Sequence, residues 1–179
     1  MKSETTSSRF ILRSLNPQQD DFTKYLSWMQ DYDSNPFICG VRENLTLAEL
    51  CHFVSEKNAS PHAILFGIFT KSDLQHIGNV KLEPINKNNT ATLGILVGDE
   101  SYRGKGVGFE VLSAVLDFAF NDLTLRKVEL GVENKNEIAL KLYHKLGFLE
   151  CRNGNELGHG IKMEIHSDYW LKTKLIEKF

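Results

Sequence analysis

The hydrophobic and polar positions in the first part of the chain follow a strand pattern and then two helical patterns. Residues 9–15 alternate well enough for a half-buried strand. Apolar residues at helical spacing follow, and Asp20 or Asp21 can serve as the N-cap of that helix. Thr46, with Glu49 three residues later, forms a capping-box pattern before a second helical segment. This part of the chain therefore predicts a strand followed by two helices.

The middle of the chain has the short period of strands. An unbroken apolar run at 63–69 is followed by a turn-like segment and by an alternating segment at 77–85. The polar residues 86–89 form another turn before the apolar segment 92–97. Three successive strands joined by short turns predict an antiparallel meander.

The last part of the chain alternates helical and strand patterns. Segment 107–120 is apolar nearly all round, which is typical of a helix packed on a sheet. A strand at 127–132, a helix at 136–146 and a strand from Phe148 follow, and 161–165 is the candidate partner of that last strand. The whole pattern predicts an α/β (α+β) fold, with a mixed, largely antiparallel central sheet of about six or seven strands flanked by about four helices.

Length and composition are those of one folded domain. The chain has 179 residues, of which 41% are hydrophobic and 25% are charged, so it can build a core and does not have a disordered composition. We assign residues 9–166 to one domain and 167–179 to a C-terminal tail with a helix as a candidate conformation. The glycine-containing loop 153–160 is a candidate specificity segment.

Charge and cysteine content exclude several classes of protein. The net charge of −2 lacks the basic excess of proteins that bind nucleic acid or anionic membranes. The chain has neither a long apolar run nor a signal-peptide pattern, so we expect a cytoplasmic protein without a membrane segment. Cys39, Cys51 and Cys151 form no paired motif, so neither a disulfide framework nor a metal site is expected.

The segment with the clearest chemistry is the glycine loop RGKGVG at 103–108, between an apolar strand and a buried helix. Alternating glycines let the backbone approach a ligand closely and adopt positive φ. The free amides at the start of the following helix favour a phosphate or pyrophosphate, with Arg103 and Lys105 as added positive charge. The spacing fits neither a Walker A loop nor a dinucleotide fingerprint, and a loop that only turns the chain remains the alternative.

Two spaced motifs, in the right order, resemble those of a known family. Arg103-x-x-Gly106-x-Gly108 is similar to the pyrophosphate loop of the GNAT superfamily of acetyl-CoA-dependent N-acetyltransferases. The downstream Asn136-x-x-Ala139-x-x-x-Tyr143, followed by Gly147-Phe148, resembles the second half of that family. The pattern is most similar to the branch containing ribosomal-protein N-terminal, diamine and amino-sugar-nucleotide acetyltransferases.

The resemblance implies acetyl-CoA as the acetyl donor and direct attack of an amine on its thioester. It implies that the pyrophosphate lies on the amides of the glycine loop. It also implies that a backbone N–H near the end of the fourth strand, that of Leu96, Val97 or Gly98, holds the thioester carbonyl. Asn136 is expected to bind the pantetheine arm. The implied cofactor-binding residues are Leu96, Val97, Gly98, Arg103, Gly104, Lys105, Gly106, Val107, Gly108 and Asn136.

The catalytic residues implied by the resemblance are an acid and a base. Tyr143 is the implied general acid, because a phenol with a pKa of about 10 can protonate a departing thiolate. Packing on a helical face is the other explanation of this tyrosine. Glu83 is the candidate base, with His76, Asp99 and water-relayed deprotonation as alternatives, because Thr92 stands where relatives often carry Glu.

The implied acceptor is a primary amine, either a small amine such as an amino sugar or sugar nucleotide, or a protein N-terminus. Trp28, Asp31 and Tyr32 are the candidate pocket residues, and Trp28 is equally explained as a core aromatic. No nucleic-acid partner is expected, and a homodimer is a further hypothesis. A non-catalytic acyl-CoA-binding or sensing module and a nicotinamide-dependent enzyme are the alternative functions.

Overall fold

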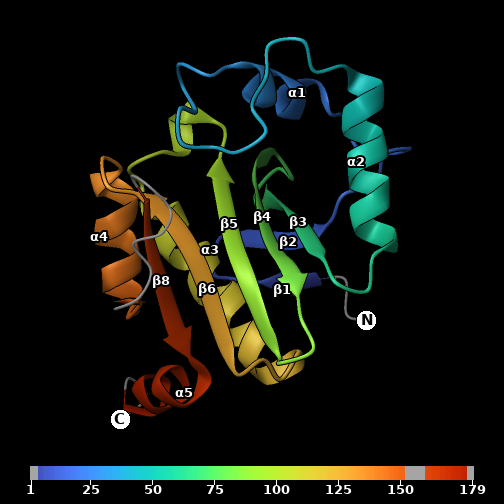
Figure 1. Ribbon diagram of the computed structural model, residues 1–179. Coiled ribbons are helices and arrows are strands. Elements are labelled where there is room, and N and C mark those ends of the chain that lie inside the picture. The colour runs from blue at the N-terminus through green and yellow to red at the C-terminus, as the bar shows by residue number, and fades with distance from the viewer. Residues whose placement is uncertain (1–3, 152–159, 177–179) are drawn as a thin grey trace.

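One mixed sheet forms the centre of the molecule. A computed structural model describes residues 4–151 and 160–176, and in that part of the chain eight strands pair in the order β1-β2-β3-β4-β5-β6-β8-β7 (Figure 1). The strands are β1 (Glu4–Thr6), β2 (Phe10–Ser14), β3 (Ile64–Thr70), β4 (His76–Ile85), β5 (Thr90–Val97), β6 (Lys127–Glu133), β7 (Leu149–Glu150) and β8 (Gly160–His166). The helices are α1 (Thr23–Gln30), α2 (Leu47–Ala59), α3 (Val107–Asp117), α4 (Glu137–Leu146) and α5 (Ser167–Ile176).

The predicted fold class is confirmed, and the additional strand is β1. The neighbours from β1 to β5 are antiparallel, β5 and β6 are parallel, and β8 is antiparallel to both β6 and β7. The sequence did not predict β1, because its three residues, ETT, show no alternation of apolar and polar positions. The segment 153–159 of the predicted specificity loop lies outside the described residues, and Gly160 begins β8.

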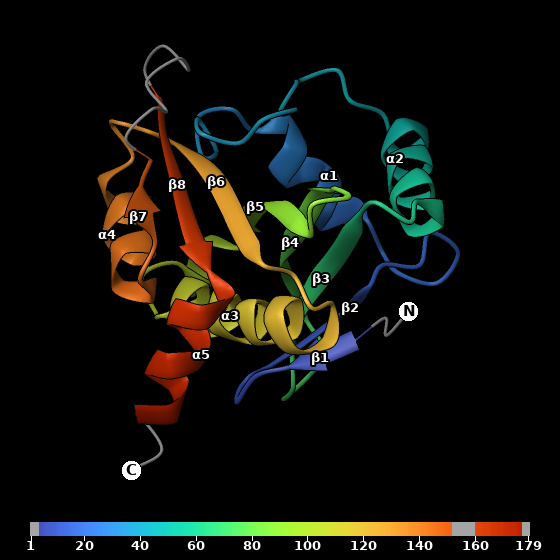
Figure 2. The ribbon, with the colours of Figure 1, turned by 60° about the horizontal axis from the view of Figure 1, so that its bottom comes forward.

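Helices cover both faces of the sheet, as Figures 1 and 2 show. Alternate residues of β3 point to opposite faces, so Ile64, Phe66 and Ile68 join the core beneath α3 and α4. Leu65 and Phe69 instead join a second core with α1 and α2. Burial on both faces explains why this strand is an unbroken apolar run and not an alternating one.

The beginning of α1 differs from the prediction. The helix starts at Thr23 after Phe22, and no side chain caps it. Asp20 is held by Arg13 at 2.6 Å, a charge-assisted contact that is a stronger partner than a helix amide. Asp21 accepts the Thr23 N–H at 2.8 Å just before the helix. The capping box predicted for α2 is confirmed.

The buried helix α3 carries a few polar side chains, and two of them connect distant segments. Glu110 accepts the Nε–H of Arg9 at 2.6 Å, which ties the start of β2 to the helix. Asp117 accepts the indole N–H of Trp170 at 2.8 Å, which ties α5 to the same helix. The last turn continues as a π-helix at Phe118–Asp122. None of the helices in the described part of the chain has the length and apolar character needed to cross a bilayer.

The feature that positions the site is a split in the sheet between β5 and β6. The two strands pair only where Thr90–Thr92 faces Lys127–Glu129. Beyond that point β5 stays paired with β4 and β6 stays paired with β8, while the two strands diverge from each other (Figure 1). In the part of the chain that the structure describes, no strand lies between the facing edges of 93–97 and 130–133.

Candidate active site

The glycine loop enters α3 with the conformation that its composition predicts. Gly104 and Gly106 have φ values of +71° and +76°, in the left-handed region that favours glycine. Gly106 is the N-cap of α3, and no side chain caps this helix. Since the first intrahelical bond comes from the Glu110 amide, the amides of 107–109 remain free to bind an anion.

A cation that sequence patterns did not indicate lies beside this loop. Arg9, at the start of β2, donates from Nη2 to the Lys105 carbonyl at 3.1 Å. Its Nε also binds Glu110 at 2.6 Å, so the guanidinium is fixed next to the first turn of α3. Arg9 and the loop are distant in sequence and meet only through the pairing of β2 with the sheet, so no local motif could reveal it.

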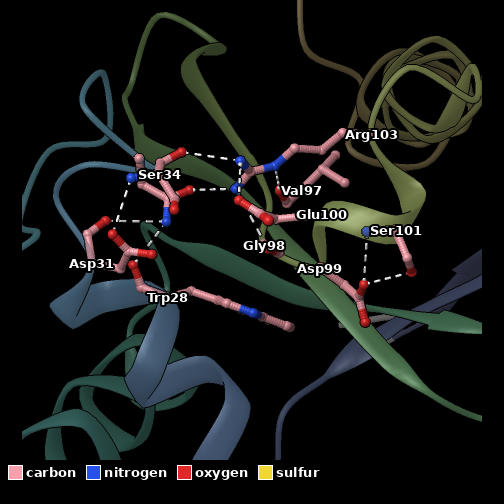
Figure 3. A network of polar contacts seen from close by, with 10 residues as sticks. Trp28, Asp31, Ser34, Val97, Gly98, Asp99, Glu100, Ser101 and Arg103 are labelled. Carbon is pink, nitrogen blue, oxygen red and sulfur yellow. Dashed lines mark hydrogen bonds and ion pairs between the residues drawn. The ribbon is translucent and has the colours of Figure 1, made fainter.

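Arg103 does not supply the positive charge that we expected from it at the glycine loop. Its side chain turns toward the end of β5 and the segment after α1 (Figure 3). Nε donates to the Val97 carbonyl at 2.9 Å, and the two terminal nitrogens donate to the Ser34 carbonyl at 3.0 Å and to Asn35 Oδ1 at 2.9 Å. The guanidinium is held there because these oxygens match its fork of donors. The backbone of Arg103 remains part of the loop.

A β-bulge ends β5 beside the split. The amides of Gly98 and Asp99 both donate to the carbonyl of Ile77 on β4, each at 3.0 Å. The backbone N–H groups of successive residues in a strand point to opposite sides. The amide of Leu96, like that of Gly98, therefore points toward β4, and the amide of Val97 points toward the β6 side. Of the three residues predicted to hold the thioester carbonyl, only Val97 turns its amide toward the split.

Trp28 lies directly against the end of β5 (Figure 3). A Cβ atom on Gly98 would come within 2.1 Å of the Trp28 indole, so only a glycine fits there. Trp28 also belongs to the core that α1 and α2 share with Leu96. Trp28 is therefore a core residue that also lines the surface beside the bulge, and its role in an acceptor pocket stays a prediction.

An acidic cavity of about 290 Å³ lies between α1 and the bulge. Hydrogen bonds hold the pKa of Asp31 and that of Asp99 below their usual range, mainly from the side chains of Ser34 and Ser101 respectively. Both carboxylates are therefore ionised at neutral pH, and Lys24 lies 3.6 Å from Asp99. The cavity is lined by Lys24, Ser27, Trp28, Asp31, Ser34, Asn35, Gly98, Asp99 and Glu100.

Two other predicted site residues, Tyr32 and Glu83, do not line this cavity. Tyr32 is 60% exposed and is not one of the lining residues. Glu83 is ion-paired with Lys57 and lies 3.9 Å from Lys81, near the end of β4 that pairs with the start of β5. The structure therefore does not bring Glu83 together with the bulge, whereas Asp99 lies next to it.

His76 is enclosed by aromatic rings. It stacks on Phe69 with the ring centroids 4.9 Å apart and meets Trp28 edge-on at 5.3 Å. Its Nε2 lies 2.9 Å from the Gly78 carbonyl, which can only accept, so Nε2 carries the proton. Burial lowers the pKa of His76, and its Nδ1 is shielded from solvent. This imidazole is therefore neutral at pH 7, and it is not one of the residues that line the cavity described above.

Tyr143 and Asn136 come from α4, across the split. Burial raises the pKa of Tyr143 to about 12, and its ring meets Phe148 edge-on at 5.8 Å. The residue as a whole is 8% exposed. Asn136 caps α4, since its Oδ1 accepts the Ala139 amide at 3.2 Å. The described residues contain no cluster of His, Cys, Asp and Glu that could hold a metal ion.

Free strand edges, with uncapped helix amides near their wide end, are features that suit an extended, phosphate-containing ligand. The acetyltransferase (GNAT) domain family matches residues 9–149. The chain therefore belongs to the GNAT acetyltransferase family.

Curated relatives carry N-acetyltransferase names. The probable N-acetyltransferase YjcK of Bacillus subtilis is 38% identical over 95 residues, which is 52% of this chain and 50% of that protein. Spermidine N(1)-acetyltransferase of Escherichia coli K12 is 36% identical over 77 residues, which is 42% of this chain and 41% of that protein. The chain thus spans about half or less of the length of these relatives.

Solved structures share the fold at low sequence identity. Spermidine N-acetyltransferase from Vibrio cholerae, in complex with CoA and spermine, has a TM-score of 0.80 and 22% identity, with 92% of this chain and 99% of that chain covered. A putative ribosomal-protein-serine acetyltransferase from Vibrio cholerae has a TM-score of 0.73 and 19% identity, with 92% and 98% covered. Both likenesses concern the fold.

Proposed function

We propose that this chain is an acetyl-CoA-dependent N-acetyltransferase whose acceptor is a small primary amine. The observation that carries the proposal is the split between β5 and β6, with the free amides of 107–109 at its wide end. The acidic cavity beside the bulge supports a cationic acceptor, and its volume of about 290 Å³ suits a small molecule better than a folded protein surface. The spermidine acetyltransferases among the relatives support the same choice.

The residues of the split fit acetyl-CoA. The thioester supplies an activated acetyl group, and the amides of 107–109 together with Lys105 would bind the pyrophosphate. The amide of Val97 would donate to the oxygen that becomes negative as the carbonyl is attacked. The Nδ2 of Asn136, whose Oδ1 caps α4, would donate to the pantetheine arm.

Proton transfer in the proposed reaction involves both sides of the split. The amine nitrogen attacks the acetyl carbonyl carbon, the carbon–sulfur bond breaks, and the departing sulfur takes a proton from Tyr143. The proton that the attacking nitrogen loses as the amide forms returns through water to the Tyr143 oxygen, which restores the phenol. A tyrosine with a pKa of about 12 carries that proton at neutral pH. The amine arrives as a cation attracted by Asp31 and Asp99, and we propose that its proton leaves to water, because Asp99 is held too acidic to be a strong base.

Two measurements test the proposed function. Calorimetry with acetyl-CoA, CoA and NADH should show binding of the two CoA species only. Release of free thiol from acetyl-CoA should then depend on an added amine. The acceptors to test are spermidine, putrescine and glucosamine, together with a peptide that has a free N-terminus. Binding of acetyl-CoA without turnover of any amine would favour the non-catalytic module. Binding of NADH without either CoA species would contradict the family-based mechanism.

We predict that Tyr143→Phe lowers kcat at least about 100-fold, because the thiolate loses its proton donor. The affinity for acetyl-CoA should stay unchanged, since the ring still packs against Phe148. Tyr169→Phe, on α5, is the matched control and should leave kcat unchanged. Equal kcat in Tyr143→Phe and the wild type would leave Tyr143 with a packing role only.

A further inference from the structure

Arg103 joins two elements that face each other across the acidic cavity (Figure 3). Its Nε donates to the carbonyl of Val97 at the end of β5, at 2.9 Å. Its terminal nitrogens donate to the Ser34 carbonyl at 3.0 Å and to Asn35 Oδ1 at 2.9 Å, both in the segment after α1. A lysine could not make these contacts at once, because an ammonium lacks the planar fork of a guanidinium.

Asn35 extends this connection to α1. This residue is 5% exposed, and its Nδ2 donates to the carbonyl of Trp28 at 3.1 Å and to that of Asp31 at 3.3 Å. These carbonyls lie in the last turn of the helix and just after it, where helix carbonyls lack partners within the helix. Asn35 therefore donates to backbone carbonyls at the end of α1 and accepts a hydrogen bond from Arg103.

The same contacts hold the bulge of β5. The Val97 carbonyl and the Gly98 amide belong to one peptide group, and Arg103 binds the carbonyl while Ile77 accepts from the amide at 3.0 Å. The neighbouring Val97 amide is the one that turns toward the split. On the opposite side of the cavity, the Trp28 indole rests on Gly98. Arg103 and Asn35 thus hold the residues that line the cavity in a fixed position relative to the Val97 amide.

We propose that Arg103 is a positioning residue for the acceptor amine, which it orders through Asn35 and the Val97 carbonyl, and that its side chain does not bind the pyrophosphate. The proposal rests on the proposed function. Removal of the guanidinium leaves the buried Asn35 Oδ1 without its donor, and an unpaired buried acceptor is costly. The segment 31–35 and the end of α1 then change their orientation toward β5.

Kinetics of four variants test the proposal. Arg103→Ala, Arg103→Lys and Asn35→Ala should each raise the KM for the amine about 10- to 100-fold, as expected for loss of hydrogen bonds to a charged group. Their Kd for acetyl-CoA, measured by calorimetry, should change less than about threefold. Lys105→Ala is the matched contrast, and it should raise the Kd for acetyl-CoA while the KM for the amine stays unchanged. An Arg103→Ala variant that weakens acetyl-CoA binding with an unchanged amine KM would overturn the proposal.

A double-mutant cycle addresses whether the two residues act together. Arg103→Ala combined with Asn35→Ala should raise the amine KM no more than the larger single effect, because one chain of contacts is broken in either case. Fully multiplicative effects would show that Asn35 and Arg103 act separately and would contradict the proposed connection. Circular dichroism and the thermal midpoint of each variant establish that it folds.

A spectroscopic readout keeps the positioning role testable without turnover. The chain has two tryptophans, so protein labelled with 5-fluorotryptophan gives two ¹⁹F resonances, which Trp170→Phe assigns. Arg103→Ala should shift the Trp28 resonance and leave that of Trp170 in place. An unshifted Trp28 resonance together with an unchanged amine KM would overturn the positioning role. Lack of turnover in the wild type would count against the proposed function alone, because a shifted Trp28 resonance would still support the connection.

Discussion

At the scale of single residues, the contact between Gly98 and Trp28 makes the site sensitive to one methyl group. A Cβ at position 98 would lie 2.1 Å from Cδ2 and 2.3 Å from Cε3 of the indole, so the ring would have to move. We predict that Gly98→Ala destabilises the fold by about 1–3 kcal/mol, the usual cost of overpacking. The displaced indole should also raise the amine KM. Urea denaturation and amine titration at saturating acetyl-CoA measure the two effects.

Gly94→Ala is a matched control on the same strand. Its added Cβ would meet only the side chain of Lys81, at 3.3 Å, and the far end of a lysine moves easily. This variant should therefore have nearly wild-type stability and amine KM. If both substitutions have the same small effect, the position of the Trp28 indole does not depend on the absence of a side chain at position 98.

At the scale of elements, a network of charges joins β6 to β8. Lys127 Nζ lies 2.8 Å from Glu164 and 2.6 Å from Glu129, and Lys162 reaches Glu129 at 3.0 Å. The hydrogen bond from Lys127 lowers the pKa of Glu164 to about 2. Because the folded pKa is below the unfolded value, this carboxylate adds stability above its ordinary pKa of about 4.3 and loses that contribution as the pH falls toward 2.

We predict that the free energy of unfolding decreases from about pH 5 to about pH 2, and that Glu164→Gln makes this decrease smaller. The variant should also be less stable than the wild type at pH 7, where the wild-type carboxylate is ionised. Urea denaturation at a series of pH values measures both effects. In a Lys127→Met background the same substitution should have less influence on the pH profile. Equal profiles in the wild type and Glu164→Gln would assign the acid sensitivity to other carboxylates.

A helix or strand could be predicted from the sequence where the spacing of apolar residues within that segment is sufficient to identify it. The strands from β2 to β6 and the helices α2 to α4 follow patterns contained within each segment, and the glycines at 104 and 106 mark the loop by themselves. The direction of the Arg103 side chain could not be predicted, because its partner Asn35 lies 68 residues earlier in the chain. The acidic cavity is likewise formed by segments that meet only in the folded sheet.

At the scale of the whole molecule, the sheet consists of two parts that are joined along a short seam. β1 to β5 form one continuous antiparallel part, and β6, β8 and β7 form the other. Three residue pairs connect β5 to β6, while the core beneath α3 continues from one part to the other. The two parts are thus firmly joined at the narrow end of the split and have free edges at its wide end.

A ligand that fills the split should therefore stabilise the molecule and protect a defined set of amides. At 100 times its Kd, acetyl-CoA should raise the free energy of unfolding by about 2.7 kcal/mol, which corresponds to roughly 5–10 °C in the thermal midpoint. Hydrogen exchange should slow at 93–97, 107–109 and 130–133, the segments that border the split, and remain unchanged in β3, which is already paired on both sides. Tyr143→Phe should show the same protection, because the proposal gives it a role in proton transfer only. Stabilisation without protection of the two facing strand edges would place the ligand elsewhere, for example in the hollow of about 550 Å³ between α3 and the start of the chain.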